Sequence, residues 1–232
     1  MHKIYQKTKK MSFFVVQNQL VTALKIKIIM SFSKKFKTLG DVLLEYKIRY
    51  EGRVFKITQM MPAPQRLVED LEFAYEEIPF DASEATIREV LIFPILKEVW
   101  RPYTKYLTVW GHKPIEVDKL SGVPDYLIAK RSSLGKIVFE TPYVAVVEAK
   151  MDDFTGGWAQ CALEMYAMQL LNKDETLPIH GIVSNGKGWE IAMLERNVFV
   201  KYRQRFDMER VDELFSALTQ LFEFYKQYFI NH

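Results

Sequence analysis

Two short apolar runs with charged residues at their ends constrain the fold of this chain more than any other feature. One run covers residues 143–147 and is followed by Glu148 and Lys150. The other covers residues 126–129 and directly follows Asp125. Apolar runs of this length are typical of buried strands. We therefore expect two strands whose charged ends interrupt an otherwise apolar core.

The charged residues at the strand ends are predicted to lie together. Alternate residues of a strand point to the same face, so Glu148 and Lys150 project together, and Asp125 reaches the same place if the two strands are neighbours. A buried carboxylate or ammonium group is costly unless it is compensated. Two carboxylates beside one amine suit a divalent cation with oxygen ligands, with the lysine near the attacking water or the developing phosphoryl charge. The pattern favours a metal-dependent nuclease.

The motif Pro124-Asp125, followed by Glu148-Ala149-Lys150, resembles that of the PD-(D/E)XK nuclease superfamily, and looks most like the branch with the nuclease domain of type I restriction motor subunits. The resemblance covers about residues 80–200, where a helix is expected before the two strands and a further helix and strand after them. It implies an α/β fold with an αβββαβ core, in which helices flank a mixed central sheet. It also implies cleavage of DNA with Mg²⁺, or Mn²⁺, as cofactor.

The resemblance assigns roles to the motif residues. Asp125, Glu148 and the backbone carbonyl of Ala149 are expected to hold the cation, and Glu84 is expected to complete the metal site. Lys150 is expected to position or polarise the attacking water and to offset charge in the transition state.

Glu84 lies at the predicted start of a helix, where its role has two interpretations. Ile87, Leu91 and Ile95 follow it at helical spacing, so its carboxylate shares the stripe that faces the core. Alternatively, Glu84 only completes a capping box with Asp81 as the cap and favours the helix dipole. The resemblance favours the metal site, because a glutamate on the first helix of these nucleases often assists the metal.

A later helix is predicted for residues 158–171, with Gln160 and Glu164 one turn apart near its start. In related nucleases a glutamine on this helix often points at the metal-bound water or the substrate backbone, and Gln160 resembles that accessory residue. The fuller Gln-x-x-x-Tyr pattern of some branches is missing because Glu164 stands at the tyrosine position, so Gln160 equally suits a structural polar residue. Asp152 and Asp153 are interpreted as loop carboxylates rather than ligands.

Three parts are predicted along the chain: a basic N-terminal extension (residues 1–37), an accessory layer (residues 38–80) and the nuclease-like domain with a C-terminal helix (residues 81–232). The 232 residues, 49% of them hydrophobic, allow one sizeable core. Helices are predicted for residues 39–46 and 66–77 and from 84 and 211 onwards, and strands for residues 50–60, 106–110, 114–120, 179–184 and 189–194. Pro94 is expected to kink or shorten its helix.

The formal charge is unevenly distributed. Of the overall +3, the first 40 residues contribute +9 through nine lysines without an acidic residue or arginine, which leaves −6 for the rest. A DNA contact must therefore rest on a local basic patch, the extension, the metal or a partner. The basic loop of residues 130–136 is either a solubilising turn or a phosphate contact beside the site. Residues 1–29 are expected to have little order, whether or not Met30 is the true start.

Several protein classes are disfavoured. Cys161, the only cysteine, is expected to be a small buried residue, which excludes an intrachain disulfide and a thiolate zinc cluster. The four histidines lack metal-ligand spacing, which disfavours a zinc hydrolase. The sequence has no Walker-type phosphate loop and no apolar run long enough for a membrane span. We expect a cytoplasmic protein that acts on DNA, and leave open a homodimer or a partner subunit of a restriction or defence assembly.

Two alternatives to a nuclease remain. One is a nuclease-like fold that serves as a binding or scaffold subunit, which the acidic body favours slightly and the intact set of two acids and a lysine opposes. The other is a purely structural protein in which Glu148 and Lys150 form a strand-end ion pair. Geometry discriminates between them, because a nuclease requires Asp125 and Glu148 on the same face of the sheet.

Overall fold

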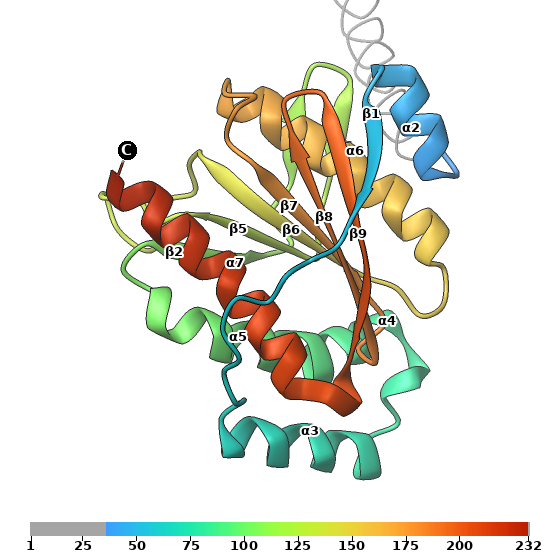
Figure 1. The fold of residues 1–232 in the computed structure, drawn as a ribbon, viewed down its shortest axis with the longest axis vertical. Helices are drawn as coiled ribbons and strands as arrows, with labels where there is room; N and C mark the ends of the chain where they lie inside the picture. Colours follow the sequence, from blue (N-terminus) through green and yellow to red (C-terminus); the bar gives the residue numbers. More distant parts are fainter. Residues whose placement is uncertain (1–35, 232) are drawn as a thin grey trace, which may run out of the picture.

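The helices and strands follow the apolar patterns of the sequence. The computed structural model describes residues 36–231, and the predictions for residues 1–35, including a start at Met30, lie outside the described residues. The helices are α2 (Leu39–Tyr46), α3 (Gln65–Glu77), α4 (Glu84–Ile87), α5 (Phe93–Trp100), α6 (Phe154–Asn172) and α7 (Val211–Asn231) (Figure 1). The strands are β1 (Arg49–Arg53), β2 (Leu107–Gly111), β3 (Ile115–Val117), β4 (Leu120–Gly122), β5 (Tyr126–Lys130), β6 (Tyr143–Ala149), β7 (Ile179–Ser184), β8 (Gly188–Glu195) and β9 (Val198–Asp207). Short turns of other helix types are η1 (Phe80–Ala82), η2 (Arg88–Ile92), η3 (Arg101–Tyr103) and η4 (Met208–Arg210).

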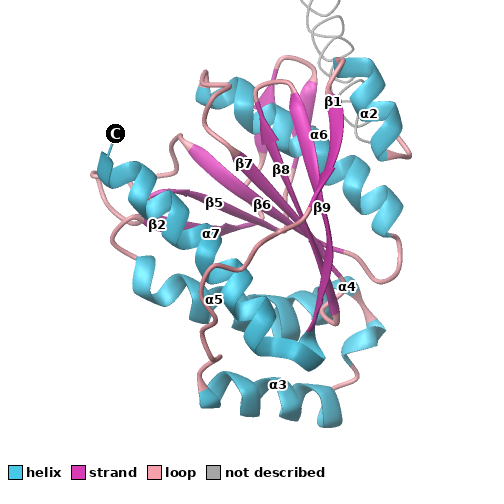
Figure 2. Ribbon diagram, viewed as in Figure 1, coloured by secondary structure: helices cyan, strands magenta, loops and turns pink. Residues whose placement is uncertain are grey.

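The central sheet has seven strands in the order β1-β9-β8-β7-β6-β5-β2 (Figure 2). β1 is parallel to β9 and β6 is parallel to β7, and the other neighbours are antiparallel. β3 and β4 form a separate two-stranded hairpin. The predicted α/β class, with a mixed central sheet flanked by helices, is confirmed, and β5 and β6 are direct neighbours.

Helices cover both faces of this sheet (Figure 1). α6 and α2 lie on one side of the sheet together with the β3–β4 hairpin, whereas α5 and α7 lie on the other side, where α3 packs against α5 and η2. Side chains of β6 alternate between the two faces, with Val146 on the α6 side and Ala145 and Val147 on the α5 side. Every residue of β6 is buried. A charge on this strand must therefore be compensated inside the protein.

The helix before the motif strands begins with a serine cap. The Ser83 hydroxyl accepts a hydrogen bond from the backbone N–H of Thr86, which satisfies one of the free donors at the helix start. The prediction that Asp81 caps this helix is wrong, and so is the capping-box interpretation of Glu84. Glu84 is exposed at the start of the helix, whereas Ile87, Leu91 and Ile95 are buried, so the prediction that its carboxylate shares the stripe facing the core is wrong.

α4, η2 and α5 form one long helix that contains a π-helical turn. In this turn the Phe93 N–H donates to the Arg88 carbonyl, directly before Pro94. The wide turn accommodates the proline ring and its missing N–H. The helix therefore continues to Trp100, and the expectation that Pro94 shortens it is wrong.

The strand predictions need three corrections. The alternation at residues 50–60 gives a strand only at Arg49–Arg53, because the backbone beyond it bonds to side chains instead, as Phe55 N–H does to Gln204. Residues 114–120 turn back at Asp118, which has a positive φ of 53°, into the β3–β4 hairpin outside the main sheet. β9 is not predicted, and through it β1 joins the central sheet.

The later elements match the sequence patterns more closely. α6 begins at Phe154, four residues before its predicted start, because the Asp153 side chain caps it by accepting a hydrogen bond from Gly156 N–H at 2.7 Å. The predicted hairpin is confirmed as β7 and β8, and the predicted C-terminal helix is confirmed as α7. In the part of the chain that the structure describes, none of the helices has the length and apolar character of a membrane span.

Candidate active site

The register of β5 and β6 places Asp125 beside Glu148. Tyr126 pairs with Val147 in this antiparallel ladder, so Asp125, one residue earlier, stands opposite Glu148 and on the same face of the sheet. One oxygen of Asp125, Oδ2, accepts a hydrogen bond from the backbone N–H of Ala149 at 2.8 Å. Both motif carboxylates therefore meet at the carboxyl end of β6.

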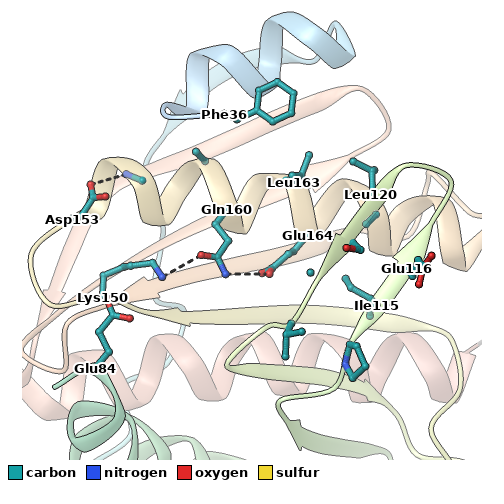
Figure 3. A pocket seen from close by; sticks show the side chains of 17 residues that line it. Phe36, Glu84, Ile115, Glu116, Leu120, Lys150, Asp153, Gln160, Leu163 and Glu164 are labelled. Atoms are coloured by element: carbon teal, nitrogen blue, oxygen red, sulfur yellow. Dashed lines mark hydrogen bonds between the residues drawn. The ribbon is translucent and has the colours of Figure 1, made fainter. Parts of the chain in front are cut away.

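A line of polar side chains runs from this strand end to α6 (Figure 3). The Lys150 amine (Nζ) lies 3.5 Å from Oε2 of Glu148 and 3.2 Å from Oε1 of Gln160. The amide group of Gln160 in turn donates to Oε1 of Glu164 at 3.3 Å. Gln160 therefore lies in the site, where it links the lysine to a second buried glutamate.

Glu148 and Glu164 are poorly compensated buried acids. They are 1% and 4% exposed, and among the described residues Oε1 of Glu148 and Oε2 of Glu164 have no hydrogen-bond partner. Burial, followed by the charge of Glu164, raises the pKa of Glu148 well above the usual range, although the Lys150 ammonium lowers it. Burial also raises the pKa of Glu164 to about 7. Without another positive charge, the pair therefore retains a proton near neutral pH.

Asp125, in contrast, has protein partners on both oxygens. Its Oδ1 forms an ion pair with the Arg88 guanidinium at 2.6 Å, and Nε2 of His112 lies 3.8 Å from the same atom. Its Oδ2 accepts the bond from the Ala149 backbone. Asp125 is thus held in place from two sides, by the long helix and by β6.

Glu84 begins α4 and lines the same cavity as Lys150. Its side chain points towards the lysine (Figure 3). Burial lowers the pKa of Lys150, but the charges of Glu148, Glu84 and Asp125 together raise the pKa by more. Lys150 is therefore an ammonium ion at neutral pH, suited to stabilising negative charge rather than to accepting a proton.

A cavity of about 680 Å³ opens between α6 and the β3–β4 hairpin. Glu84, Lys150, Gln160 and Glu164 form its polar end (Figure 3). The apolar side chains of the wall include Ile115, Leu120, Val123 and Leu163. Gly122 allows the hairpin to approach Glu164 closely, since a Cβ at this position would lie 2.9 Å from Oε1 of Glu164. The recess is thus lined by both charged and apolar side chains, with Glu116 beside Ile115 and Leu120 (Figure 3).

The oxygen atoms at the strand end fit a hard divalent cation. Glu148 offers a buried oxygen without a partner, and carboxylate and carbonyl oxygens are the ligands that Mg²⁺ takes. The N–H and C=O of a residue in a strand face the same neighbour, so the Ala149 carbonyl faces the Asp125 side, as its N–H does. Within residues 36–231, no group of three or more His, Cys, Asp or Glu side chains could hold a metal ion. The candidate ligand set is therefore two carboxylates and one carbonyl.

Three residues of the site are missed by sequence reasoning, namely Arg88, His112 and Glu164. Glu164 leaves a usable signal, because it is the only charged residue in the 19 residues of α6. Arg88 follows Glu84 by one helical turn and reaches Asp125 on the motif strand. His112 follows β2 directly, and its position depends on the pairing of β2 with β5. Neither of these two contacts has a signature in the spacing of residues.

Other predicted features lie away from the site or are structural. The loop of residues 130–136 follows β5 at the end opposite Asp125, roughly 15 Å away at about 3.3 Å per residue, so the interpretation as a phosphate contact beside the site is wrong. Asp153 is a helix cap and Asp152 is exposed. Cys161 is buried, as predicted.

The sequence matches none of the known protein-family models and none of the curated proteins with which it was compared. The function of the protein is therefore inferred from the site itself.

Proposed function

We propose that this protein hydrolyses phosphodiester bonds of DNA with the help of Mg²⁺ or Mn²⁺. The observation that supports this most is the meeting of Asp125, Glu148 and Lys150 at one strand end, beside a recess. We also propose that the fold is restriction-endonuclease-like. The order of the long helix, β2, β5, β6, α6 and β7, with β2, β5, β6 and β7 adjacent in that order in the sheet, agrees with an αβββαβ core.

The residues of the site divide the work of hydrolysis between them. Asp125, Glu148 and the Ala149 carbonyl would hold the cation, and Glu84 lines the recess beside Lys150 from the long helix. When bound, such a cation polarises the phosphoryl group and lowers the pKa of a water molecule. The Lys150 ammonium donates hydrogen bonds to the attacking water or to a phosphoryl oxygen and stabilises the charge that develops there.

Gln160 and the buried carboxyl pair restrain this lysine. The Gln160 carbonyl accepts a hydrogen bond from Lys150 while its amide donates to Glu164. The hydrogen bond to Gln160 therefore positions the lysine before substrate arrives, with its amine 3.5 Å from Glu148. Because positioned donors gain most where water is excluded, the burial of this group supports a catalytic use.

The substrate and partners follow from the same proposal. The chain beyond the N-terminal extension is acidic overall, so contact with DNA would rest on the local cations Arg88 and Lys150 and on the bound metal. A cytoplasmic protein that acts as a homodimer, or with a partner subunit of a restriction or defence assembly, is consistent with this use.

A cleavage assay tests the proposal. The purified chain is incubated with supercoiled plasmid and with linear DNA, in Mg²⁺, in Mn²⁺ and in EDTA. We expect nicking or cutting with either cation and none in EDTA. Lys150→Ala should lower the cleavage rate about 10³-fold, whereas the matched control Lys201→Ala should leave it unchanged. Lys201 is similarly buried and forms its own ion pair, with Glu190 at 2.6 Å.

A non-catalytic scaffold is the second candidate function, and one observation favours it. Both oxygens of Asp125 already have protein partners, one of them the Arg88 guanidinium. A scaffold would retain this ion pair permanently and would bind nucleic acid or a partner without cutting. Wild-type protein whose melting temperature does not respond to Mg²⁺ or Mn²⁺, and which cuts no nucleic acid, would leave only this function.

A further inference from the structure

Arg88 stands at the point where the long helix meets the candidate active site. It is the first residue of the π-helical turn η2, and wide turns of this kind are frequent at functional sites. Its guanidinium forms the 2.6 Å ion pair with Oδ1 of Asp125, and the two side chains are 19% and 12% exposed. The Tyr126 hydroxyl donates to the Arg88 backbone carbonyl at 3.3 Å. The arginine is thus held against the motif strand by both its backbone and its side chain.

The bond to Asp125 has a different meaning from an ordinary structural ion pair. It occupies an oxygen of a residue that, under the proposed function, must bind a divalent cation. A guanidinium and a dication at one carboxylate repel each other, and the repulsion is strong where solvent is largely excluded. Cation binding at Asp125 therefore requires Arg88 to find another partner.

A phosphate group of the substrate is the partner that the chemistry offers. Guanidinium presents five donors in a flat fork that matches phosphate oxygens, and it keeps its charge at every physiological pH. The ion pair uses the Nη1 end of this fork. A rotation of the Arg88 side chain would move its donors from Asp125 to a phosphate held at the same cation, with the backbone unchanged.

We propose that Arg88 is a phosphate-binding residue that alternates between Asp125 and the DNA backbone, an inference that rests on the proposed function. In the free protein it neutralises Asp125 and weakens cation binding. With cation and DNA present it binds a phosphoryl oxygen and contributes to the transition state. Cation and DNA therefore bind cooperatively. A DNA phosphate draws Arg88 away from Asp125, which frees Asp125 for the cation, and a cation at Asp125 releases Arg88 for the phosphate.

Variants of Arg88 separate these two roles. Arg88→Ala removes the competitor and the phosphate ligand together, while Arg88→Lys keeps the charge but loses the fork. Arg210→Ala is the control, since Arg210, on η4, forms ion pairs with Asp207 at the end of β9 and with Glu213 on α7, outside the site. Mn²⁺ affinity is measured by calorimetry without DNA, DNA affinity in EDTA, and the cleavage rate in single turnovers at saturating Mg²⁺.

We expect Arg88→Ala to bind Mn²⁺ about tenfold more tightly than wild type without DNA, on the scale of one lost interaction with a nearby charge. Its cleavage rate should fall about 100-fold, as for the loss of one positioned donor at a developing charge. Arg88→Lys should keep the Mn²⁺ affinity of wild type and recover only part of the rate. The salt dependence of DNA binding by Arg88→Ala should fall by about one phosphate contact.

Two results would overturn this role for Arg88. Weaker Mn²⁺ binding by Arg88→Ala would show that the arginine only holds Asp125 in place, and an unchanged cleavage rate in Arg88→Lys would show that the fork touches no phosphate. The Arg88→Lys rate decides the question even if Arg88→Ala does not fold. Wild-type protein that binds no Mn²⁺ and cuts no DNA would instead refute the proposed function, and the inference with it.

Discussion

Two buried regions of this protein hold glutamates in opposite ways. Glu98, on α5, is buried between two arginines, with Arg66 and Arg101 both 2.6 Å from Oε1. The hydrogen bond from Arg101, and then that from Arg66, lower the pKa of Glu98 despite its burial. Glu148 and Glu164 are also buried, yet their pKa values are raised and each has an oxygen without a partner among the described residues.

The contrast shows where the fold satisfies its charges and where it does not. Buried polar atoms are nearly always hydrogen-bonded, and an exception needs an explanation. The long 3.5 Å separation of Lys150 and Glu148, against 2.6 Å at Glu98, is a poor structural ion pair, which argues against the purely structural alternative. Local conflicts of this kind are expected at functional sites, where stability is given up for chemistry.

The largest expected effect concerns Lys150. If this effect is absent, the contrast between a structural region at Glu98 and a functional region at Glu148 does not hold. Lys150→Ala should lower the cleavage rate about 10³-fold, or about 4 kcal/mol in the barrier, because it removes the ammonium at the reacting centre. The fold should persist, with the melting temperature within a few degrees of wild type. Single-turnover cleavage and thermal unfolding, with and without Mg²⁺, measure both effects.

The structural alternative predicts the reverse for the same variant. If Lys150 only pairs with Glu148, Lys150→Ala should have a lower melting temperature than wild type. Mg²⁺ should then leave the melting temperature of both proteins unchanged. Asp125→Ala is the less clear probe, because it leaves the Arg88 guanidinium without its 2.6 Å partner and so combines a structural cost with the loss of a ligand. Asp125→Asn keeps the shape of the side chain and should lose both the cation response and cleavage.

The second prediction concerns Glu98, where the structural role should dominate. Glu98→Gln should lower the free energy of unfolding by about 2 kcal/mol, because it weakens two charge-assisted hydrogen bonds to a buried acceptor. The exposed Glu72 on α3 is the control, and Glu72→Gln should change stability by no more than about 0.5 kcal/mol. Denaturant unfolding measures both. A cost at Glu98 no larger than at Glu72 would remove the contrast between the two regions.

Sequence reasoning succeeds where the contacts of the site are local or follow from a strand pairing. The alternation along β6 and the adjacency of β5 suffice to bring Asp125, Glu148 and Lys150 together. Arg88 could not be placed in this way, because its contact depends on how the long helix docks on the sheet. Pro94 predicts a kinked or shortened helix, and the π-helical turn that lets the helix continue past the proline has no simple sequence signature.

Glu164 could not be interpreted from helical periodicity either. α6 is buried both against the sheet and against the β3–β4 hairpin. It therefore has apolar residues on more than one side, and a polar residue among them does not stand out in the helical pattern. The hairpin approaches through Gly122, a contact between distant parts of the chain. The edge pairing of β1 with β9 likewise joins residues about 150 positions apart, such as Arg49 and Val198. No local sequence pattern predicts this pairing.

The third prediction concerns the cost of the unsatisfied pair. Glu164→Gln should raise the free energy of unfolding of the cation-free protein by about 1 kcal/mol at pH 8, since it removes a buried charge and gives the unpartnered Glu148 oxygen a donor. For a chain of this length that is an increase of about 2–4 °C in melting temperature. The same variant should bind Mn²⁺ more weakly than wild type. A variant less stable than wild type at pH 8 would mean that the charge of Glu164 is compensated after all.

The smallest expected effect is the pH dependence of the stability gained by Glu164→Gln. This pH dependence shows whether the gain comes from removing the Glu164 charge. Burial raises the pKa of Glu164 from the ordinary value near 4.5 to about 7 in the folded protein, where the neighbouring Glu148 also has a raised pKa. A group whose pKa is raised by folding stabilises the fold below its unfolded pKa, and this contribution is lost as the pH rises through the folded value. The advantage of Glu164→Gln over wild type should therefore shrink as the pH falls from 7 to 4.5 and be absent below it.

Burial of His180 lowers its pKa to about 3 and destabilises the fold in acid, but it does so in both proteins and cancels in the difference. Thermal unfolding of both proteins at matched pH values in EDTA measures this difference, and a gain that stays constant down to pH 4.5 would assign it to packing rather than to the charge.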